Sequence, residues 1–434
     1  MNKNTFALLA AMTTVCSAFS LTVTDVSAQA QRYPWSNFID IDFTLGDAGA
    51  DEQFKIDVKA SYLGDTRILD ARMFVTEPVV KPGTRRITWD IGKDYPGFKA
   101  DDLRVAVTAS PFTNGVDGVY MVIDLSGGKN ATKYPVRYST TPPKHSVNAE
   151  DPCKTTEMWL KRIKCGSFMF CEGDSDPGEF KVNLTKDFYM GIFECTQQQW
   201  AQVTGNWPSL FKNEQFRATR PCENIGQTLI RGHFQWPRTK EPTAGSFVGK
   251  VRGRSGLATF DLPTEAQWEY ANRCGARNGA HWCYKVDSDN MRYNMPNSTV
   301  DYNCDLSGGT ITVGAYSPNI WGIYEMFGNV AELCLDASVG LEALCKYYGA
   351  LTGLSEAEST YDKVVVDDPE GGPLKNTYPE GHEWKKYESS AESTHVMRGA
   401  SWYNTSGHMT HHSRYNNDNF NSEAKGVRFV VTCE

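Results

Sequence analysis

Three of the eight histidines in the chain lie close together near the C-terminus, at His408, His411 and His412. On a helix the three side chains would share one face, and on a strand His408 and His412 would lie on the same side. Imidazoles bind copper, iron or zinc and also act as general bases. The same pattern also fits the polar wall of a ligand pocket or a plain surface. Of these three interpretations, we favour the pocket wall.

The segment that contains the histidines, 396–429, begins and ends with residues typical of a protein core. An apolar entry leads to Arg398 and then to a corner of small residues, Gly399-Ala400-Ser401. This pattern predicts a strand that feeds a tight, closely packed turn with a buried tryptophan after it. We therefore expect a pocket here, and its candidate residues are Trp402, Asn404, His408, Met409, His411, His412 and Arg414.

Two capped helices are expected to support this segment. Thr264 and Gln267 have the spacing of a capping box and mark the start of a helix over 262–273. Thr196 is expected to cap a shorter helix over 197–203.

The first of these helices carries two carboxylates four residues apart, at Glu265 and Glu269. The pair could act as acid and base. Such a pair more often lies on a solvated helix face or binds a core arginine. We expect Arg414 and Arg428 to pair with buried carboxylates such as Glu269, because an unpaired buried charge is costly.

Composition limits the class of protein and of partner. The 434 residues exceed one ordinary core, so two domains are expected. The formal charge is −8, and no lysine–arginine run stands out, which argues against nucleic acid and anionic membranes as partners. Aromatic residues make up 12% of the chain, which is typical of a globular protein with many packed loops.

The N-terminus has the pattern of a secretory signal. Lys3 precedes a short apolar stretch, and small residues follow at Ala18-Phe19-Ser20. We expect a signal peptide over 1–20, with cleavage after Ala30 as a second possibility. No stretch of 18 apolar residues predicts a membrane span. The protein is therefore expected to be exported to the periplasm, the cell surface or the medium.

Export changes how the cysteines are interpreted. Eleven of the twelve remain after Cys16 is removed, and all of them lie in the C-terminal two-thirds: Cys153, Cys165, Cys171, Cys195, Cys222, Cys274, Cys283, Cys304, Cys334, Cys345 and Cys433. In an oxidising compartment the default expectation is structural disulfides. An odd number leaves at least one thiol outside an intramolecular pair.

Strand and linker patterns suggest the domain boundaries. Alternating apolar residues and turn residues over 21–140, best seen at 37–45, predict an antiparallel β-sandwich as an accessory domain. A Pro/Ser/Thr linker is expected over 141–152. The second domain would occupy 153–434, with a polar insertion over 338–395 that runs along the surface.

Five ordered signatures in this second domain resemble the formylglycine-generating enzyme family, also called the sulfatase-modifying factor domain. They are Phe193-Glu194-Cys195-Thr196 with Gln199-Trp200, the Leu262–Tyr270 helix, the Pro318–Glu332 loop, Arg398-Gly399-Ala400-Ser401-Trp402, and Gly426-Val427-Arg428-Phe429. The resemblance implies an α+β, C-type-lectin-like fold with little regular structure, here preceded by the β-sandwich.

The resemblance also implies a calcium site in the 318–332 loop. Enzymes of the family bind calcium there through side-chain oxygens and backbone carbonyls, as a hard cation requires. Carried onto this chain, the ligands would be the side chains of Glu325 and Glu332 and the carbonyls of Met326, Gly328 and Val330. The alternative is the start of a helix with a charged face.

The family's oxidase chemistry requires two cysteines, which bind copper as thiolates shortly after the RGGSW sequence. In this chain those positions are Asn404 and Met409. An amide is no soft ligand, and a lone thioether is a weak substitute for a thiolate. Copper is therefore not expected.

Two functions remain for such a chain. The preferred one is a calcium-stabilised scaffold that lacks oxidase activity and binds a protein or glycan in its C-terminal pocket. The alternative is a divergent oxidase that modifies sulfatases or other proteins, with a metal bound by histidines. A purely structural surface component is a third and smaller possibility. The sequence leaves the oligomeric state open.

Overall fold

The computed structural model divides the chain into two compact units, Met1–Val119 and Tyr120–Glu434. In the first unit it describes residues 21–31, 37–49, 52, 54–71, 74–75, 78–95, 97–100, 102–111 and 119. In the second unit it describes 120–147, 149–171, 179–232, 236, 240–275, 309–319, 321–355, 357–371, 395–404, 414–416 and 422–433.

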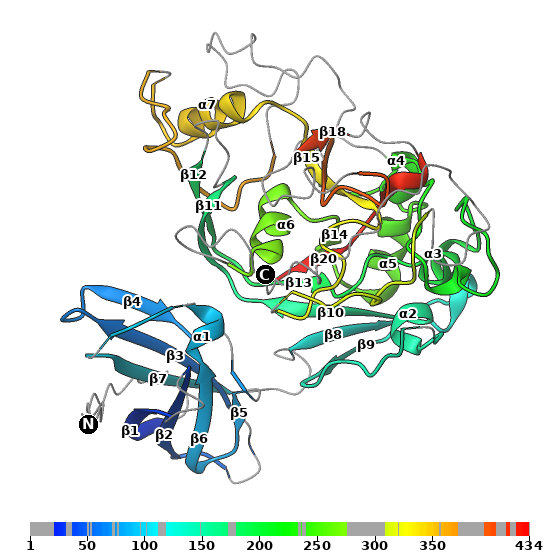
Figure 1. Ribbon diagram of the computed structural model, residues 1–434. Helices are drawn as coiled ribbons and strands as arrows, with labels where there is room; N and C mark the ends of the chain where they lie inside the picture. Colours follow the sequence, from blue (N-terminus) through cyan, green and yellow to red (C-terminus); the bar gives the residue numbers. More distant parts are fainter. Residues whose placement is uncertain are drawn as a thin grey trace. The chain divides into compact units, whose positions relative to one another are not determined.

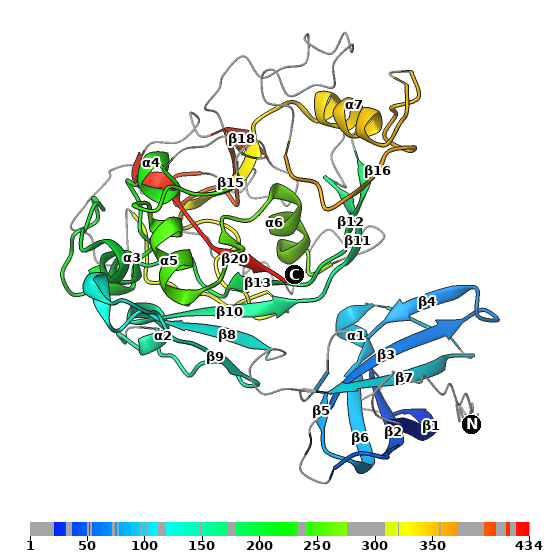
Figure 2. The same cartoon turned by 180° about the vertical axis from the view of Figure 1, so that it is seen from behind.

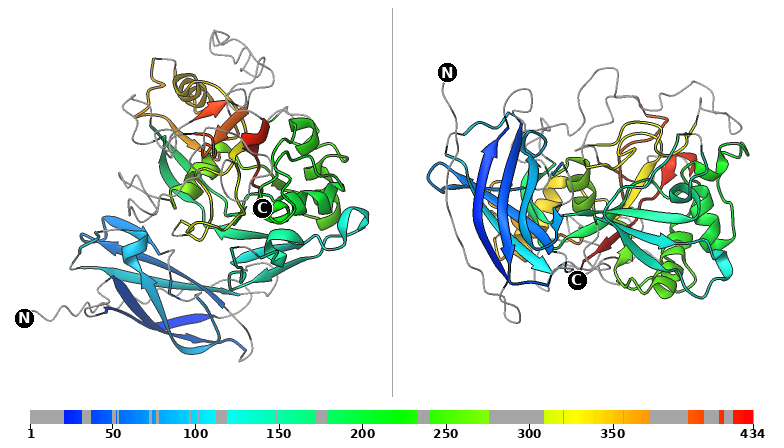
Figure 3. Two further views of the ribbon diagram at one scale, coloured as in Figure 1. Left: turned by 45° about the vertical axis from the view of Figure 1, so that its right-hand side comes forward. Right: turned by 90° about the horizontal axis from the view of Figure 1, so that it is seen from below.

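The first unit consists of two antiparallel sheets around one apolar core (Figure 3). One sheet has the order β1 (Thr22–Ala30), β2 (Phe38–Gly46), β6 (Gly83–Asp90). In the other, β3 (Phe54–Tyr62) pairs with β4 (Arg67–Asp70), β5 (Val79–Val80) and β7 (Arg104–Pro111), and a short helix α1 (Ile91–Asp94) follows β6. Every second residue of β2 is buried, namely Ile39, Ile41, Phe43 and Leu45. This alternation turns one face of the strand toward the core.

The second unit is organised around a six-stranded sheet that ends with the C-terminal strand. Its order is β14 (Phe260–Asp261), β20 (Val430–Thr432), β13 (Phe188–Gly191), β10 (Glu157–Ile163), β8 (Tyr120–Asp124), β9 (Val136–Ser139). Helices α3 (Gln197–Thr204) and α5 (Phe247–Ser255) lie on one side of it (Figure 1). Trp200 of α3 and Phe247 of α5 stack at 4.7 Å and belong to the same core as the strands.

Two smaller sheets complete the unit. One has the order β18 (Tyr415–Asn416), β17 (His395–Arg398), β15 (Ala331–Ala337), β19 (Lys425–Gly426). The other consists of β11 (Gly166–Phe170), β12 (Phe180–Leu184) and β16 (Val365–Asp367). The remaining α-helices are α2 (Pro152–Thr155), α4 (Gln227–Ile230), α6 (Glu265–Asn272) and α7 (Leu341–Leu351). The chain is thus rich in strands with few helices, and none of the described helices is long and apolar enough to cross a membrane.

The unit boundary differs from the one expected from the sequence. We assigned 21–140 to the sandwich and 141–152 to a linker. Strands β8 and β9 instead pair with each other and, through β8, with β10 of the second unit. Part of the expected linker also packs there, since the buried Lys154 ammonium donates to the carbonyls of Ser146 and Val147. Strand pairing over a distance in the chain cannot be seen in a local pattern.

The expected surface insertion over 338–395 is partly a structural element. Helix α7 buries Leu344, Cys345, Tyr347 and Tyr348, and β16 pairs in parallel with β12 (Figure 2). This part of the insertion therefore has regular structure, with β16 extending one edge of a sheet, while residues such as Leu351 and Val365 are exposed on the surface. The rest of it, 372–394, lies outside the described residues.

Both expected helices are present, with the caps that the sequence indicates. Thr264 and Gln267 exchange the two hydrogen bonds of a capping box at the start of α6. Thr196 and Gln199 do the same at the start of α3. Each box satisfies backbone N–H groups that the first helical turn leaves unpaired.

The boundary yields a prediction for two truncated chains. A chain of 120–434 should fold as a stable unit, because it keeps β8 and β9. A chain of 141–434 should unfold at a much lower temperature or aggregate, since it loses the core side chains Met121, Ile123, Leu125 and Tyr134 and exposes the edge of β10. Circular dichroism during heating measures both. Equal melting temperatures would contradict this boundary.

Candidate functional site

Two tight turns dock against each other at the expected C-terminal pocket. Strand β17 ends at Arg398, and Gly399 and Ala400 then adopt left-handed conformations with φ of 86° and 57°. The Gly328 N–H donates to the Gly399 carbonyl at 2.9 Å, and the Trp402 N–H donates to the Asn329 carbonyl at 2.9 Å. A Cβ atom on Gly399 would lie 3.0 Å from the Met326 carbonyl oxygen, so this close approach requires glycine. The predicted strand and turn are confirmed.

The residues after the turn differ in exposure. Trp402 is buried, packs edge-on against Phe211 at 5.6 Å and donates its indole N–H to the Glu423 carbonyl. The next residue, Tyr403, is 56% exposed. Asn404 folds back onto the turn, where its Oδ1 accepts from the Ser401 N–H at 2.9 Å and the Ser401 hydroxyl at 2.7 Å. Trp402 and Asn404 thus hold the turn, and Tyr403 points to solvent.

Helix α6 supplies a buried pair of carboxylates beneath this turn. Arg398 bridges them: its Nε lies 2.9 Å from Glu265 Oε1, and its Nη2 lies 2.5 Å from Glu269 Oε2. Arg414 binds Glu265 with two nitrogens, at 2.5 and 2.8 Å, and Arg273 lies 3.2 Å from Glu269. The solvated-face interpretation is wrong, because both carboxylates are buried, and the core-arginine interpretation is confirmed. Arg414 thus pairs with a buried carboxylate as expected, with Glu265 in place of Glu269, which was the example given.

The charges of this network set the protonation of its members. Burial raises the pKa of Glu265, but the Arg414 and Arg398 guanidiniums outweigh it and hold that pKa below its usual value. Burial, and then the nearby Glu265 charge, raise the pKa of Asp336 to about 7. Burial also raises the pKa of the Cys171 thiol beside Arg398, so this cysteine is not an activated nucleophile.

The carboxylates expected to bind calcium already have other partners. Glu332 accepts from Arg428 Nε at 3.0 Å, from Arg428 Nη2 at 2.6 Å and from the Trp268 indole N–H at 2.7 Å. Glu325 turns its carboxylate to the backbone N–H groups of Gly314 and Tyr316. Burial raises the pKa of Glu325 to about 7.

The loop itself adopts the sharp turn that was expected, with Gly328 and Asn329 at φ of 79° and 54°. A strand, β15, follows it, so the helix-start alternative is wrong. The Met326 carbonyl accepts from the Asn272 amide. The N–H groups of Gly328 and Val330 donate to the Gly399 carbonyl and the Glu194 carboxylate, and these bonds do not involve the Gly328 and Val330 carbonyls expected to bind calcium. Within the described ranges, no group of three His, Cys, Asp or Glu side chains could hold a metal ion. Calcium binding stays a prediction.

Sequence reasoning missed a third buried carboxyl group, that of Glu194, which follows β13 and binds this loop. It accepts from the Asn329 side-chain amide at 2.6 Å and from the Val330 N–H at 3.1 Å. Burial, and then the Glu332 charge, raise the pKa of Glu194. A single carboxylate within the apolar run Tyr189–Cys195 was the available signal, because such a group must be partnered once the run is buried.

The remaining candidate residues, His408, Met409, His411 and His412, lie outside the described residues. Of the predicted site, the structure therefore places Trp402, Asn404 and Arg414. It brings Trp402 and Asn404 to the same turn and directs Arg414 toward α6.

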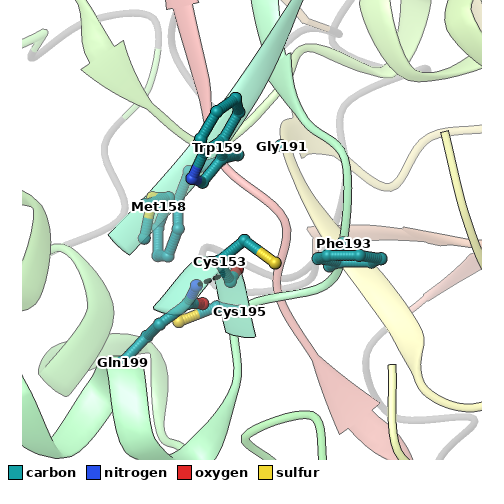
Figure 4. A pocket seen from close by; sticks show the side chains of 8 residues that line it. Cys153, Met158, Trp159, Gly191, Phe193, Cys195 and Gln199 are labelled. Carbon is teal, nitrogen blue, oxygen red and sulfur yellow. Dashed lines mark hydrogen bonds between the residues drawn. The ribbon is translucent and has the colours of Figure 1, made fainter. Parts of the chain in front are cut away.

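Two cavities lie away from this turn. One has room for about one water molecule and is lined by Cys153, Met158, Trp159, Gly191, Phe193, Cys195, Gln199 and Phe429 (Figure 4). The other is a groove of about 430 Å³ between α5, β20 and the chain after β16. Its main charges are already paired, Arg252 with Asp261 at 2.8 Å and Lys240 with Glu370 at 2.5 Å. Neither cavity contains a residue of the expected site.

The ion pairs of α6 yield a prediction about stability. Arg398→Met in the 120–434 chain should lower the free energy of unfolding by about 3 to 5 kcal/mol, because two buried carboxylates lose the guanidinium that bridges them and keep only Arg414 and Arg273. Lys240→Met is the matched control: Lys240 and Glu370 are 55% and 46% exposed, so its cost should stay below about 1 kcal/mol. Urea unfolding measures both. A similar small loss in the two variants would contradict the role of Arg398.

The chain is similar to several known proteins. It is 30% identical over 178 residues to the chaperone protein LppX of Paenibacillus barcinonensis, covering 35% of this chain and 63% of that protein. It is 25% identical over 256 residues to the serine/threonine-protein kinase pkn1 of Chlamydia pneumoniae, covering 56% of this chain and 35% of the kinase. The chain thus spans less than two-thirds of the length of these relatives.

Among solved structures, Treponema denticola variable protein 1 aligns with 68% of this chain and all of its own, at 20% identity and a TM-score of 0.40. PvdO of Pseudomonas aeruginosa aligns with 67% of this chain and all of its own, at 16% identity and a TM-score of 0.39. The sequence also matches a protein-family model, that of the sulfatase-modifying factor enzyme 1-like domain. The match covers residues 144–433, which is more than half of the chain. The chain therefore belongs to the sulfatase-modifying factor family.

Proposed function

We propose that this chain is an exported family member without oxidase activity, whose C-terminal pocket binds a protein or a glycan. The observation that carries the proposal is Asn404. By resemblance to the family, this position would hold the first copper-binding thiol. Here its amide oxygen is bound to Ser401, so the side chain closes the turn. Copper(I) requires soft sulfur ligands, and none is supplied at this position.

An exposed aromatic side chain at the same turn supports a binding role. Tyr403 packs edge-on against the buried Trp402 at 5.6 Å and is itself 56% exposed. A large side chain that is anchored on one side and open on the other loses little freedom on binding, and tyrosine is enriched among the residues that dominate interfaces. We assign Tyr403 to the ligand contact.

In this proposal Arg428 supplies the positive charge that the sequence led us to expect from calcium. Its guanidinium lies against Glu332 and also donates to the carbonyls of Gly191 and Tyr324. A calcium ion bound to Glu332 would have to compete with this guanidinium. The scaffold is therefore proposed to be stable without the ion.

Export belongs to the proposal as well, and the position of β1 bears on the cleavage site. Strand β1 begins at Thr22 and pairs with β2 along most of its length. Cleavage after Ser20 would leave this strand intact, whereas cleavage after Ala30 would remove it. The sheet therefore favours Ser20.

The absence of oxidase activity is tested with a sulfatase peptide that contains the target cysteine. The chain lacking residues 1–20 is incubated with this peptide, copper and oxygen, and the peptide is then weighed by mass spectrometry. We expect no change in mass. A loss of mass at the cysteine would overturn the proposal and favour the divergent oxidase.

Ligand contact is tested by Tyr403→Ala. For a ligand found on a glycan array or by co-purification from a cell-surface extract, this change should weaken binding about tenfold or more, because it removes the aromatic contact. Leu351→Ala is the matched control, since Leu351 is 54% exposed and lies on α7, away from the turn. Calorimetry measures both affinities. Equal affinities would exclude Tyr403 from the contact.

A calcium titration tests whether the Arg428 guanidinium or a calcium ion supplies the positive charge beside Glu332. We expect millimolar calcium to shift the melting temperature by less than about 1 °C, as magnesium would. An ion bound at a hundred times its dissociation constant would instead add about 2.7 kcal/mol and raise the melting temperature by several degrees. Such a rise, lost in Glu332→Gln, would establish the calcium site and remove Arg428 from this role.

A further inference from the structure

Two buried cysteines lie opposite each other on paired segments of the second unit. Thr196 and Pro221 form an isolated antiparallel bridge. The hydrogen bonds on either side of it are Cys222 N–H to the Cys195 carbonyl, at 2.7 Å, and Gln197 N–H to the Arg220 carbonyl, at 2.9 Å. In an antiparallel register, the residues before Thr196 and after Pro221 face each other. These residues are Cys195 and Cys222.

This register matches the geometry of a disulfide. Residues joined by such hydrogen bonds typically have Cα atoms about 5.5 Å apart. Disulfides join Cα atoms about 4.4 to 6.8 Å apart. Opposed residues also project their side chains to the same face of the pair. Both cysteines are buried in the same apolar core, and the Cys195 thiol is close enough to add to the effect of burial in raising the pKa of Cys222.

Another possible partner for Cys195 is less well placed. Cys153 lines the same water-sized cavity as Cys195. Figure 4 shows their sulfur atoms directed to opposite sides, with that of Cys153 toward Phe193 and that of Cys195 toward Gln199. The backbone hydrogen bond that Cys195 makes to Cys222 has no counterpart between Cys195 and Cys153 among the described contacts. The geometry therefore favours Cys222.

We propose that Cys195 and Cys222 form a disulfide when the chain folds in an oxidising compartment. The oxidant is an organic disulfide, either a small molecule or a protein. One cysteine thiolate attacks it, forms a mixed disulfide and releases one thiolate. The second cysteine thiolate then attacks the bound cysteine sulfur and releases the other. Two protein thiols lose two electrons and two protons, and the organic disulfide is reduced to two thiols.

The bond has to form before the core closes. Both residues are buried, and burial raises the pKa of both thiols, so the folded reduced protein holds them as unreactive thiols. Oxidation of the folded chain should therefore be slow, and oxidation during folding should be fast.

The bond would strengthen one wall of the C-terminal turn. The loop that it closes, 196–221, contains α3 and also Phe211, against which Trp402 packs. Cys195 also donates its N–H to the Val427 carbonyl at 2.8 Å, in the segment that contains Arg428. This inference does not depend on the proposed ligand, because it concerns the support of the turn and not its contact surface.

Peptide mapping tests the proposal directly. The full chain is produced once in an oxidising bacterial periplasm and once in a reducing cytoplasm, denatured in an alkylating reagent and digested with trypsin. Cys195 falls in fragment 187–212, Cys222 in 218–231 (Arg220 precedes proline and is not cut) and Cys153 in 145–154, each with one cysteine. We expect the linked pair 187–212/218–231 in the periplasmic sample alone. Alkylated fragments, or the pair 145–154/187–212, would overturn the proposal.

Thermal stability gives a second measurement on the same samples. Oxidation should raise the melting temperature of the wild type and of Cys153→Ala by about 5 °C more than that of Cys195→Ala or Cys222→Ala, because only the first two keep the constraint on the unfolded chain. Each alanine creates a small core cavity that lowers the melting temperature of the oxidised and reduced forms alike. The difference in melting temperature between the two forms of one variant is therefore free of this effect. An equal gap in all four proteins would contradict the pairing.

Discussion

The second unit depends on the neutralisation of buried carboxylates on one short helix. Glu265 and Glu269 of α6 have no access to water, and a buried carboxylate without a partner is strongly destabilising. Arg398, at the end of β17, binds both of them. Arg414, just before β18, binds Glu265 from a second direction. Neither strand can move away from the helix without breaking an ion pair with a buried carboxylate. The main effect of the ion pairs is therefore to fix the positions of these segments, and their contribution to net stability is smaller.

A further ion pair extends the constraint to the end of the chain. Trp268 of α6 donates its indole N–H to Glu332 of β15, and Glu332 binds Arg428. Every residue of α6 is consequently buried, which is unusual for a helix with two glutamates. The turn at Gly399 can approach Trp268 and the Met326 carbonyl this closely because the surrounding strands are held in register by these charges. The geometry of the candidate site is thus a consequence of its electrostatics.

Local features of the structure could be predicted from the sequence, and distant pairings could not. The cap of α6 needs only Thr264 and Gln267, and the inward face of β2 follows from strict alternation. Glu269 pairs with Arg273 four residues on, as a helical pattern allows, but it also pairs with Arg398, 129 residues away, which nothing in that pattern identifies. The same holds for β8, which joins β10 across a turn-rich stretch that we interpreted as a linker. Helix α7 was missed because its apolar face was assigned to a polar insertion.

The pairings also explain why strong family signatures do not fix the chemistry. Arg398, Gly399 and Trp402 have structural roles: they bind α6, permit a close approach and fill the space beside Phe211. None of these roles requires a reaction at the turn. Position 404 requires only a group that can close the turn, and an asparagine oxygen bound to Ser401 meets that requirement as a side chain without redox chemistry. The residues that hold the turn and the residues that would carry out a reaction are therefore separable. A match to the residues that hold the turn identifies the family, and the proposed lack of oxidase activity depends on the residues at positions 404 and 409.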